Sequence, residues 1–166
     1  MQLRPGACSI KMSKEIEKQY NELRKKFRLP DFKEIDFEFE ISDLEETNFL
    51  LRCIIRRIAE KLDFYTTMIE ELLQPDTSNV YAMHETSFFS DIEKKLMYDL
   101  YKRLMSLNRS SIAASLNHNE KEEIAFIKTI FDEWKEIKKD LLFFVKKMKS
   151  SWNTELDIKD DIGYLG

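Results

Sequence analysis

The chain has 166 residues, 43% of them hydrophobic and 35% charged, and its net charge is −4 at pH 7. This composition excludes an intrinsically disordered chain, is typical of one folded domain, and argues against a dedicated nucleic-acid-binding protein, which is usually strongly basic. No apolar run approaches the roughly 18 residues of a membrane-spanning helix, and the N-terminus lacks the apolar block of a signal peptide.

Residues 7–162 contain no glycine. The three glycines of the chain lie near its ends, at Gly6, Gly163 and Gly166. Glycine supplies the positive-φ residues of tight hairpins, phosphate-binding loops and strained catalytic turns. Its absence, with only three prolines, predicts an all-α fold. We expect a single-domain bundle of three to four long antiparallel helices, with a short N-terminal helix and an extended or short helical segment at 31–41.

The composition changes at both ends of the chain. Residues 1–11 contain Pro5 and Gly6 and show no apolar periodicity, so we expect a disordered or non-native extension there. Residues 12–152 carry the periodic pattern of the helical bundle. Residues 153–166 form an acidic C-terminal tail with spaced apolar side chains. This tail is typical of a short docking peptide, or alternatively it covers the end of the bundle.

The first helix is expected from about Ser13 to Arg28, since Pro30 disfavours helical geometry in the residue before it. In residues 31–41 apolar side chains alternate with acidic ones, as in a half-buried strand, at Ile35, Phe37, Phe39 and Ile41. A helix would also place Phe32, Ile35 and Phe39 on one face. Because a lone strand has no partner elsewhere in the sequence, we favour a short helix or an extended segment across the bundle.

The second helix is predicted from Ser42, which forms a capping-box pattern with Glu45, to Gln74, which precedes Pro75. One apolar face is expected at Leu51, Ile54, Ile55, Ile58, Leu62, Tyr65, Ile69 and Leu72. A weaker apolar face lies on the far side, at Phe49, Cys53, Phe64 and Met68. A helix that is apolar on two sides is either central in a bundle or contacts a partner.

Residues 75–90 form the only long connection. The third helix follows from Ser90, again with a capping box to Glu93, and turns near Asn117. Its core face is predicted at Phe89, Ile92, Leu96, Leu100, Leu104 and Leu107. The fourth helix is capped by Asn119 and runs to about Trp152, with a core face at Ile124, Ile127, Phe131, Trp134, Leu141, Val145, Met148 and Trp152.

Sequence patterns of catalytic, cofactor and metal sites are missing. A di-iron bundle needs Glu-x-x-His pairs, but His84 and His118 lie in predicted connections and are read as surface residues. Two cysteines, Cys8 and Cys53, are too few for a zinc site or a disulfide framework, so we expect a reduced, cytoplasmic location. We predict no catalytic residue, no cofactor, no metal and no small-molecule substrate, and the chain is more consistent with a non-enzyme.

Two features point to an interaction surface. On the fourth helix an aromatic residue, Phe143, lies away from the core face and is surrounded by Lys135, Lys139, Lys146 and Lys147. An exposed aromatic ring among lysines suits an acidic protein partner or a stacked base, although charged faces on helices often serve only solubility. The second feature is the acidic segment, residues 31–41. Its Phe37 and Phe39 suit a basic surface on another molecule, or alternatively the segment folds back onto the second helix.

The leading functional hypothesis is therefore a non-enzymatic protein–protein interaction or assembly module, acting on a partner or on itself. The alternative is a nucleic-acid-associated helical protein, with a role in replication or RNA metabolism, that binds through the lysine-rich face around Phe143. The stretch DLYKRLMSLNRSSI, followed by a helix with an acidic start, resembles the helical domain of archaeal GINS replication subunits. The small β-domain of that family has no counterpart in this sequence, so the resemblance carries no family assignment.

Overall fold

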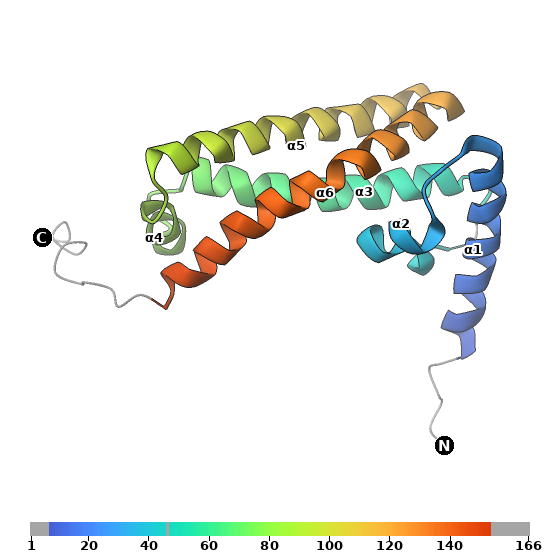
Figure 1. Ribbon diagram of the computed structural model, residues 1–166, viewed down its shortest axis with the longest axis horizontal. Coiled ribbons are helices and arrows are strands. Elements are labelled where there is room, and N and C mark those ends of the chain that lie inside the picture. The colour runs from blue at the N-terminus through green and yellow to red at the C-terminus, as the bar shows by residue number, and fades with distance from the viewer. Residues whose placement is uncertain (1–6, 46, 154–166) are drawn as a thin grey trace, which may run out of the picture.

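The structure is a computed structural model that describes residues 7–45 and 47–153, with side chains from residue 14 onward. Every regular element in this part of the chain is helical (Figure 1). The elements are α1 (Ala7–Phe27), α2 (Phe32–Phe39), the 3₁₀ turn η1 (Ile41–Asp43), α3 (Leu50–Leu73), α4 (Val80–Ser87), α5 (Asp91–Asn117) and α6 (Glu120–Ser151). The predicted all-α bundle is confirmed. Residues 1–6 of the predicted extension and 154–166 of the predicted tail lie outside the described residues.

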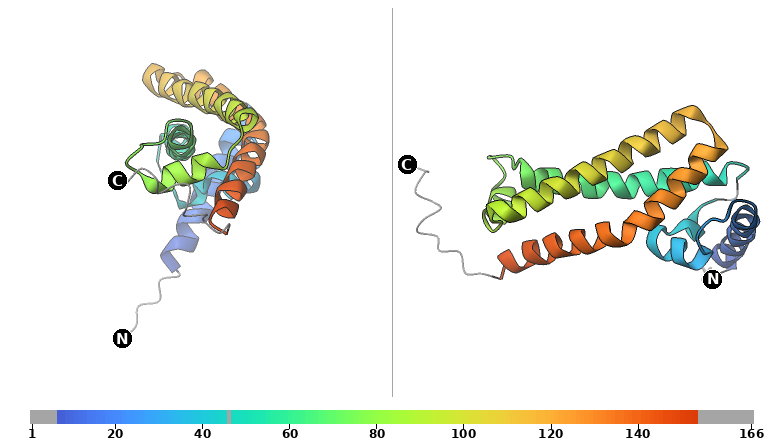
Figure 2. Two further views of the ribbon diagram at one scale, coloured as in Figure 1. Left: turned by 90° about the vertical axis from the view of Figure 1, so that its left-hand side faces the viewer. Right: turned by 45° about the horizontal axis from the view of Figure 1, so that its top comes forward.

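Three long helices, α3, α5 and α6, pack along the longest dimension of the molecule, and each runs antiparallel to the one before it (Figure 1). The helix α1 lies across one end of this bundle. The short helix α4 lies at the other end and contacts both α3 and α6 (Figure 2). The remaining short helix, α2, lies between α1 and the middle of α6.

The helix α3 carries the centre of the core. Its predicted apolar face is buried at Leu51, Ile54, Ile55, Ile58, Leu62, Ile69 and Leu72. Because burying one aliphatic side chain contributes about 1.5–3 kcal/mol, this face is a main source of the bundle's stability. The second predicted face is largely open: Phe49 and Phe64 are 59% and 65% exposed, and Cys53 and Met68 are half-buried.

The predicted start of this helix at Ser42 is wrong, because α3 begins at Leu50. Glu40 adopts left-handed backbone, with φ 54°, and ends α2. The backbone N–H of Ser42 then donates a hydrogen bond to Asp36 Oδ1 at 2.6 Å. Ser42 therefore lies in η1 and closes the end of α2 instead of capping a new helix.

Two further elements differ from the prediction. The helix α1 begins at Ala7, earlier than Ser13, because no proline or glycine interrupts the chain from there to Phe27. The long connection over 75–90 contains α4. Its cap is Asn79, whose side chain accepts hydrogen bonds from the backbone N–H groups of Tyr81 and Ala82 at 3.0 and 3.3 Å.

The helix α5 begins at the predicted Ser90–Glu93 capping box. Its buried face follows alternating steps of three and four residues, at Met97, Leu100, Leu104, Leu107, Ser111 and Ala114. Two residues predicted in the core, Ile92 and Leu96, are 76% and 54% exposed, since the buried face passes through Met97.

The helix α6 begins after its predicted cap, Asn119, whose side chain accepts a hydrogen bond from the backbone N–H of Lys121 at 3.0 Å. Val145 and Trp152, predicted on its core face, are 38% and 45% exposed. The buried positions near this end of the helix are Phe144 and Ser151 instead. The core face of α6 therefore passes through Phe144 and leaves Val145 on the exposed side of the helix.

The ends of three helices use left-handed backbone without glycine. The residues are Arg28, Glu40 and His118, with φ of 55°, 54° and 49°. Left-handed backbone costs a non-glycine residue about 1–2 kcal/mol. Residues 7–162 thus make tight helix ends without glycine, and the packing of the helices has to offset their strain.

The carboxylate of Glu93 fastens the start of α5 to α6. It accepts hydrogen bonds from the backbone N–H and the hydroxyl of Ser90, both at 2.8 Å, and it pairs with Lys147 of α6. The hydrogen bond from Lys147 is the largest cause that lowers the pKa of Glu93, and with those from Ser90 it brings the pKa to about 2.

This arrangement predicts a specific pH dependence. Because the pKa of Glu93 is lower in the folded protein than its ordinary value of 4.5, its stabilisation is present above pH 4.5 and lost as the pH falls towards 2. Glu93→Gln should lower the free energy of unfolding at pH 7 and flatten its fall between pH 4.5 and 2. Urea denaturation at several pH values measures this, with Glu71→Gln on the exposed side of α3 as control. Equal pH dependence in the two variants would contradict the assignment.

Candidate functional site

The short helix α2 is fixed to the bundle at its C-terminal end. The ring of Phe39 is 1% exposed, and its centre lies 5.1 Å from that of Trp134 on α6. The side chain of Glu38 accepts hydrogen bonds from Trp134 Nε1 at 2.8 Å and from Lys138 Nζ at 2.8 Å. On the other side, Lys61 of α3 donates to the backbone carbonyl of Glu38. Two consecutive residues of α2 therefore contact α3 and α6 at once.

The carboxyl group of Glu38 is held in its charged form. Burial raises its pKa, but the hydrogen bonds from Lys138 and Trp134, together with the charges of Lys138 and Lys61, outweigh burial and lower the pKa below its ordinary value. At neutral pH Glu38 therefore stays ionised and paired with Lys138. The ammonium group of Lys138 also lies 5.2 Å from the centre of the Phe37 ring.

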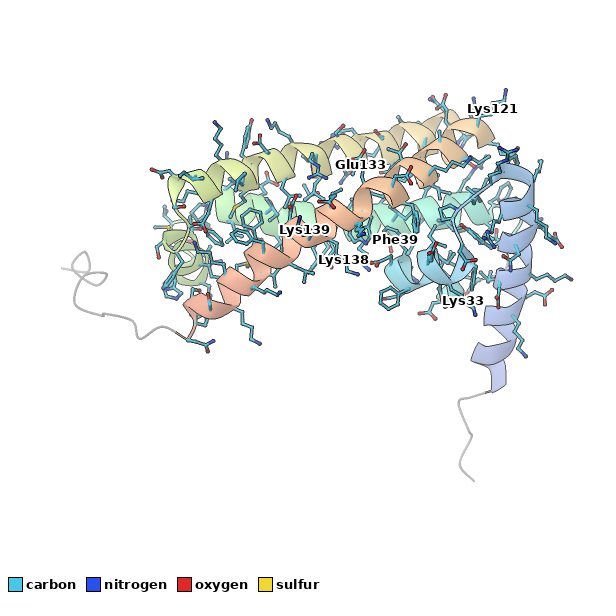
Figure 3. The ribbon with its side chains drawn as sticks, in the orientation of Figure 1. Lys33, Phe39, Lys121, Glu133, Lys138 and Lys139 are labelled. Atoms are coloured by element: carbon cyan, nitrogen blue, oxygen red, sulfur yellow. The ribbon has the colours of Figure 1, made fainter. Side chains whose placement is uncertain are left out.

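A groove of about 1190 Å³ lies between α2 and α6; we call it the α2–α6 groove. Its apolar lining consists of Phe37, Phe131, Trp134, Leu142 and Phe143. Five lysines also line the groove, and we call them the lysine rim: Lys33, Lys135, Lys138, Lys139 and Lys146. Acidic side chains lie among them, at Glu34, Glu38 and Asp132. Figure 3 labels Lys33 on α2, Lys138 and Lys139 on α6, and Phe39 where the two helices meet.

Three residues of the apolar lining are open to solvent. Phe37 is 76% exposed, and Leu142 and Phe143 are 47% and 48% exposed. The charged pair of Glu38 and Lys138 occupies one part of the groove, and the remaining lysines outnumber the remaining acidic residues. The groove therefore combines exposed apolar side chains with an excess of positive charge.

Most of the predicted interaction surface comes together in this groove, at Phe37, Lys135, Lys139, Phe143 and Lys146. The placement of Phe39 on a surface is wrong, because its ring is buried against Trp134 and anchors α2. Lys147 is directed to α5, where it pairs with Glu93.

Lys33, Lys138 and Leu142 are among the groove residues that the sequence did not predict for the interaction surface. On α6 the signal was present, because Lys138 follows Lys135 by three residues and Leu142 follows Lys138 by four. Lys33 had no such signal, since its place depends on how α2 docks against α6.

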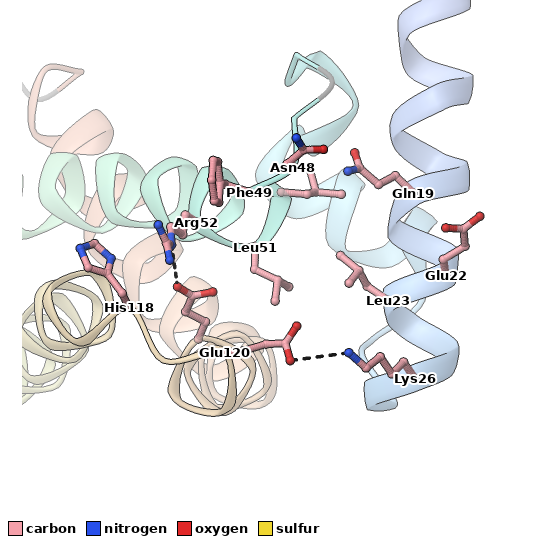
Figure 4. A pocket seen from close by; sticks show the side chains of 12 residues that line it. Gln19, Glu22, Leu23, Lys26, Asn48, Phe49, Leu51, Arg52, His118 and Glu120 are labelled. Atoms are coloured by element: carbon pink, nitrogen blue, oxygen red, sulfur yellow. Dashed lines mark hydrogen bonds and ion pairs between the residues drawn. The ribbon is translucent and has the colours of Figure 1, made fainter.

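A second pocket, of about 460 Å³, lies where α1, α3 and α6 meet (Figure 4). Its lysine and its arginine form ion pairs: Arg52 Nε lies 3.0 Å from Glu123 Oε1, and Lys26 Nζ lies 3.7 Å from Glu120 Oε2. The carboxylate of Glu123 is 6% exposed and needs this partner. The two cations that line this pocket already form ion pairs with carboxylates of α6. The pocket is therefore a junction between helices.

The two histidines lie in different surroundings. His84, read as a surface residue from the sequence, is buried, and its Nε2 lies 3.2 Å from the backbone oxygen of Ser151. The centre of its ring lies 4.5 Å from the centre of the Trp152 ring, so His84 joins α4 to the end of α6. His118 is exposed in the turn between α5 and α6. Within residues 7–45 and 47–153 no three histidine, cysteine, aspartate or glutamate side chains gather where a metal ion could bind.

None of the helices described here combines the length and the apolar character needed to cross a membrane. A scan against models of protein families, a search of curated proteins and a search of solved structures each returned no match. These comparisons therefore indicate no function for the chain.

The anchoring of α2 predicts unequal coupling energies for two neighbouring lysines of α6. Lys138 pairs with Glu38, whose side chain is 21% exposed, whereas Lys139 pairs with Glu136 at 3.7 Å with side chains 77% and 61% exposed. A double-mutant cycle of Glu38→Ala and Lys138→Ala should give a coupling of about 1 kcal/mol. The matched cycle of Glu136→Ala and Lys139→Ala should give less than about 0.5 kcal/mol. Urea denaturation measures both, and equal couplings would refute the anchoring role of Glu38.

Proposed function

We propose that the protein is a non-enzymatic binding module whose α2–α6 groove receives an acidic, amphipathic segment of another protein. One observation carries this proposal: exposed Phe37, Leu142 and Phe143 line the same groove as the lysine rim. Aromatic and aliphatic anchors with a charged rim are the usual composition of a protein-binding surface. The lysines supply attraction for an acidic partner and accelerate its association.

The length of the groove suits a short helical or extended segment. Along α6 its lining extends from Phe131 to Lys146, which corresponds to about 22 Å of helix axis. Four turns of an amphipathic helix cover that distance, and such a helix presents apolar side chains at steps of three and four residues. Acidic residues flanking those positions would meet the lysine rim.

The nucleic-acid alternative rests on the same lysines around Phe143. Glu34, Glu38 and Asp132 in the lining oppose phosphate groups, which favours a protein partner. Nucleic-acid binding predicts an affinity for a labelled oligonucleotide that falls steeply and linearly on a log–log plot as salt increases. Fluorescence anisotropy of a single-stranded oligonucleotide against salt concentration tests this alternative directly.

The proposed function predicts which peptides the full chain selects from a displayed random library. We expect the selected peptides to combine aspartate or glutamate with apolar residues at helical spacing. Phe143→Ala with Lys139→Glu should weaken the best of these peptides by at least about tenfold in isothermal titration calorimetry, because an anchor and a rim charge are lost.

A matched control makes the result specific to the groove. Phe64→Ala with Lys25→Glu removes another exposed aromatic ring and another exposed lysine, outside the groove lining, with the same change in net charge. This variant should bind the selected peptide within about twofold of the unmodified chain. Basic consensus peptides, or equal losses in the two variants, would count against the proposal.

A further inference from the structure

Residues 154–166 have the chemistry that the α2–α6 groove selects. Their acidic residues are Glu155, Asp157, Asp160 and Asp161, against one basic residue, Lys159. Their apolar residues are spaced among these charges, at Leu156, Ile158, Ile162, Tyr164 and Leu165. The segment is thus an acidic, amphipathic sequence covalently attached to a chain that carries a lysine-rimmed apolar groove.

The chain leaves α6 on the face that forms the groove. Asn153 follows Lys146 by seven residues and Lys139 by fourteen, so the three positions lie near one line along the helix. The end of α6 is held in place, because Trp152 Nε1 donates a hydrogen bond to Glu85 of α4 at 2.7 Å. The segment therefore starts from a fixed point on the groove side.

The segment is long enough to cover the groove. From Asn153 back along α6 the distance is about 10 Å to Lys146 and about 27 Å to Lys135. Residues 154–166 extend at most about 43 Å. In extended form Asp160 and Asp161 lie about 23–26 Å from Asn153, at the level of Lys139 and Lys135.

Resting on the proposed function, we infer that residues 154–166 fold back along α6 and occupy the α2–α6 groove of the same chain. Asp160 and Asp161 then face Lys135 and Lys139, and Ile158 lies at the level of Leu142. The segment competes with the acidic partner. Attachment within one chain favours this occupant over a second copy, because a short connection gives an effective concentration in the millimolar range.

Paramagnetic relaxation in the full chain tests the docking. A nitroxide is attached at Lys159→Cys in a chain with Cys8→Ser and Cys53→Ala, and amide signals are compared before and after reduction of the label. Amides of α2 and of residues 135–146 should lose at least half of their intensity, whereas those of residues 105–117 should not. Lys135→Glu with Lys139→Glu should restore the groove signals, and Lys18→Glu with Lys25→Glu should not.

Mixing identifies the chain that supplies the segment. A spin-labelled chain that is not enriched in ¹⁵N is mixed with a ¹⁵N-enriched chain that carries no spin label. No broadening of the groove amides is expected. Broadening in the mixture would show docking onto a second copy and overturn the inference. Unbroadened groove amides in the labelled chain would overturn it as well.

A measurement without a label covers the case in which the cysteine variants fail to fold. Asp160→Lys with Asp161→Lys in the full chain should shift the groove amides and tighten binding of the display-selected peptide by at least threefold, because the competitor is removed. Unchanged affinity, with the peptide still sensitive to Phe143→Ala, would overturn the inference and leave the proposed function standing. Loss of peptide selection altogether would reject both.

Discussion

Glu38 accepts hydrogen bonds from Trp134 and Lys138 on α6, its backbone carbonyl accepts one from Lys61 on α3, and the next residue, Phe39, is buried against Trp134. The groove depends on these contacts. An isolated helix shorter than about 12 residues is marginal in water, so α2, with eight residues, owes its place to tertiary packing. Without that anchor, Phe37 and Lys33 would not face α6, and the groove would lose one wall.

The anchor also explains how a chain of net charge −4 presents a basic surface. The acidic segment uses one carboxylate, Glu38, to hold α2 in place, and Asp36 closes the end of the same helix by accepting from the backbone of Ser42. Lys135, Lys139 and Lys146 of α6 remain in the rim. Net charge describes the whole chain, whereas recognition depends on how the helices distribute that charge.

The fold was largely predictable, because helix signals are local. The capping box at Ser90, the cap at Asn119 and the buried face of α3 all follow from spacing along the chain. The candidate site was half predictable for the same reason. Lys135, Lys139 and Lys146 share the helix face of Phe143. The burial of Phe39 and the contribution of Lys33 depend on docking between elements distant in sequence. The start of α3 was missed because Ser42 bonds to Asp36, which a capping pattern does not reveal.

Native-state hydrogen exchange tests most directly whether Glu38 and Phe39 hold α2 against the bundle. In the unmodified chain, the amides of Ile35 to Glu40 should exchange about as slowly as those of the middle of α6. In Glu38→Ala they should exchange at least about tenfold faster, while the amides of residues 54–62 in α3 keep their rates. Equal exchange of α2 in the two proteins would contradict the account.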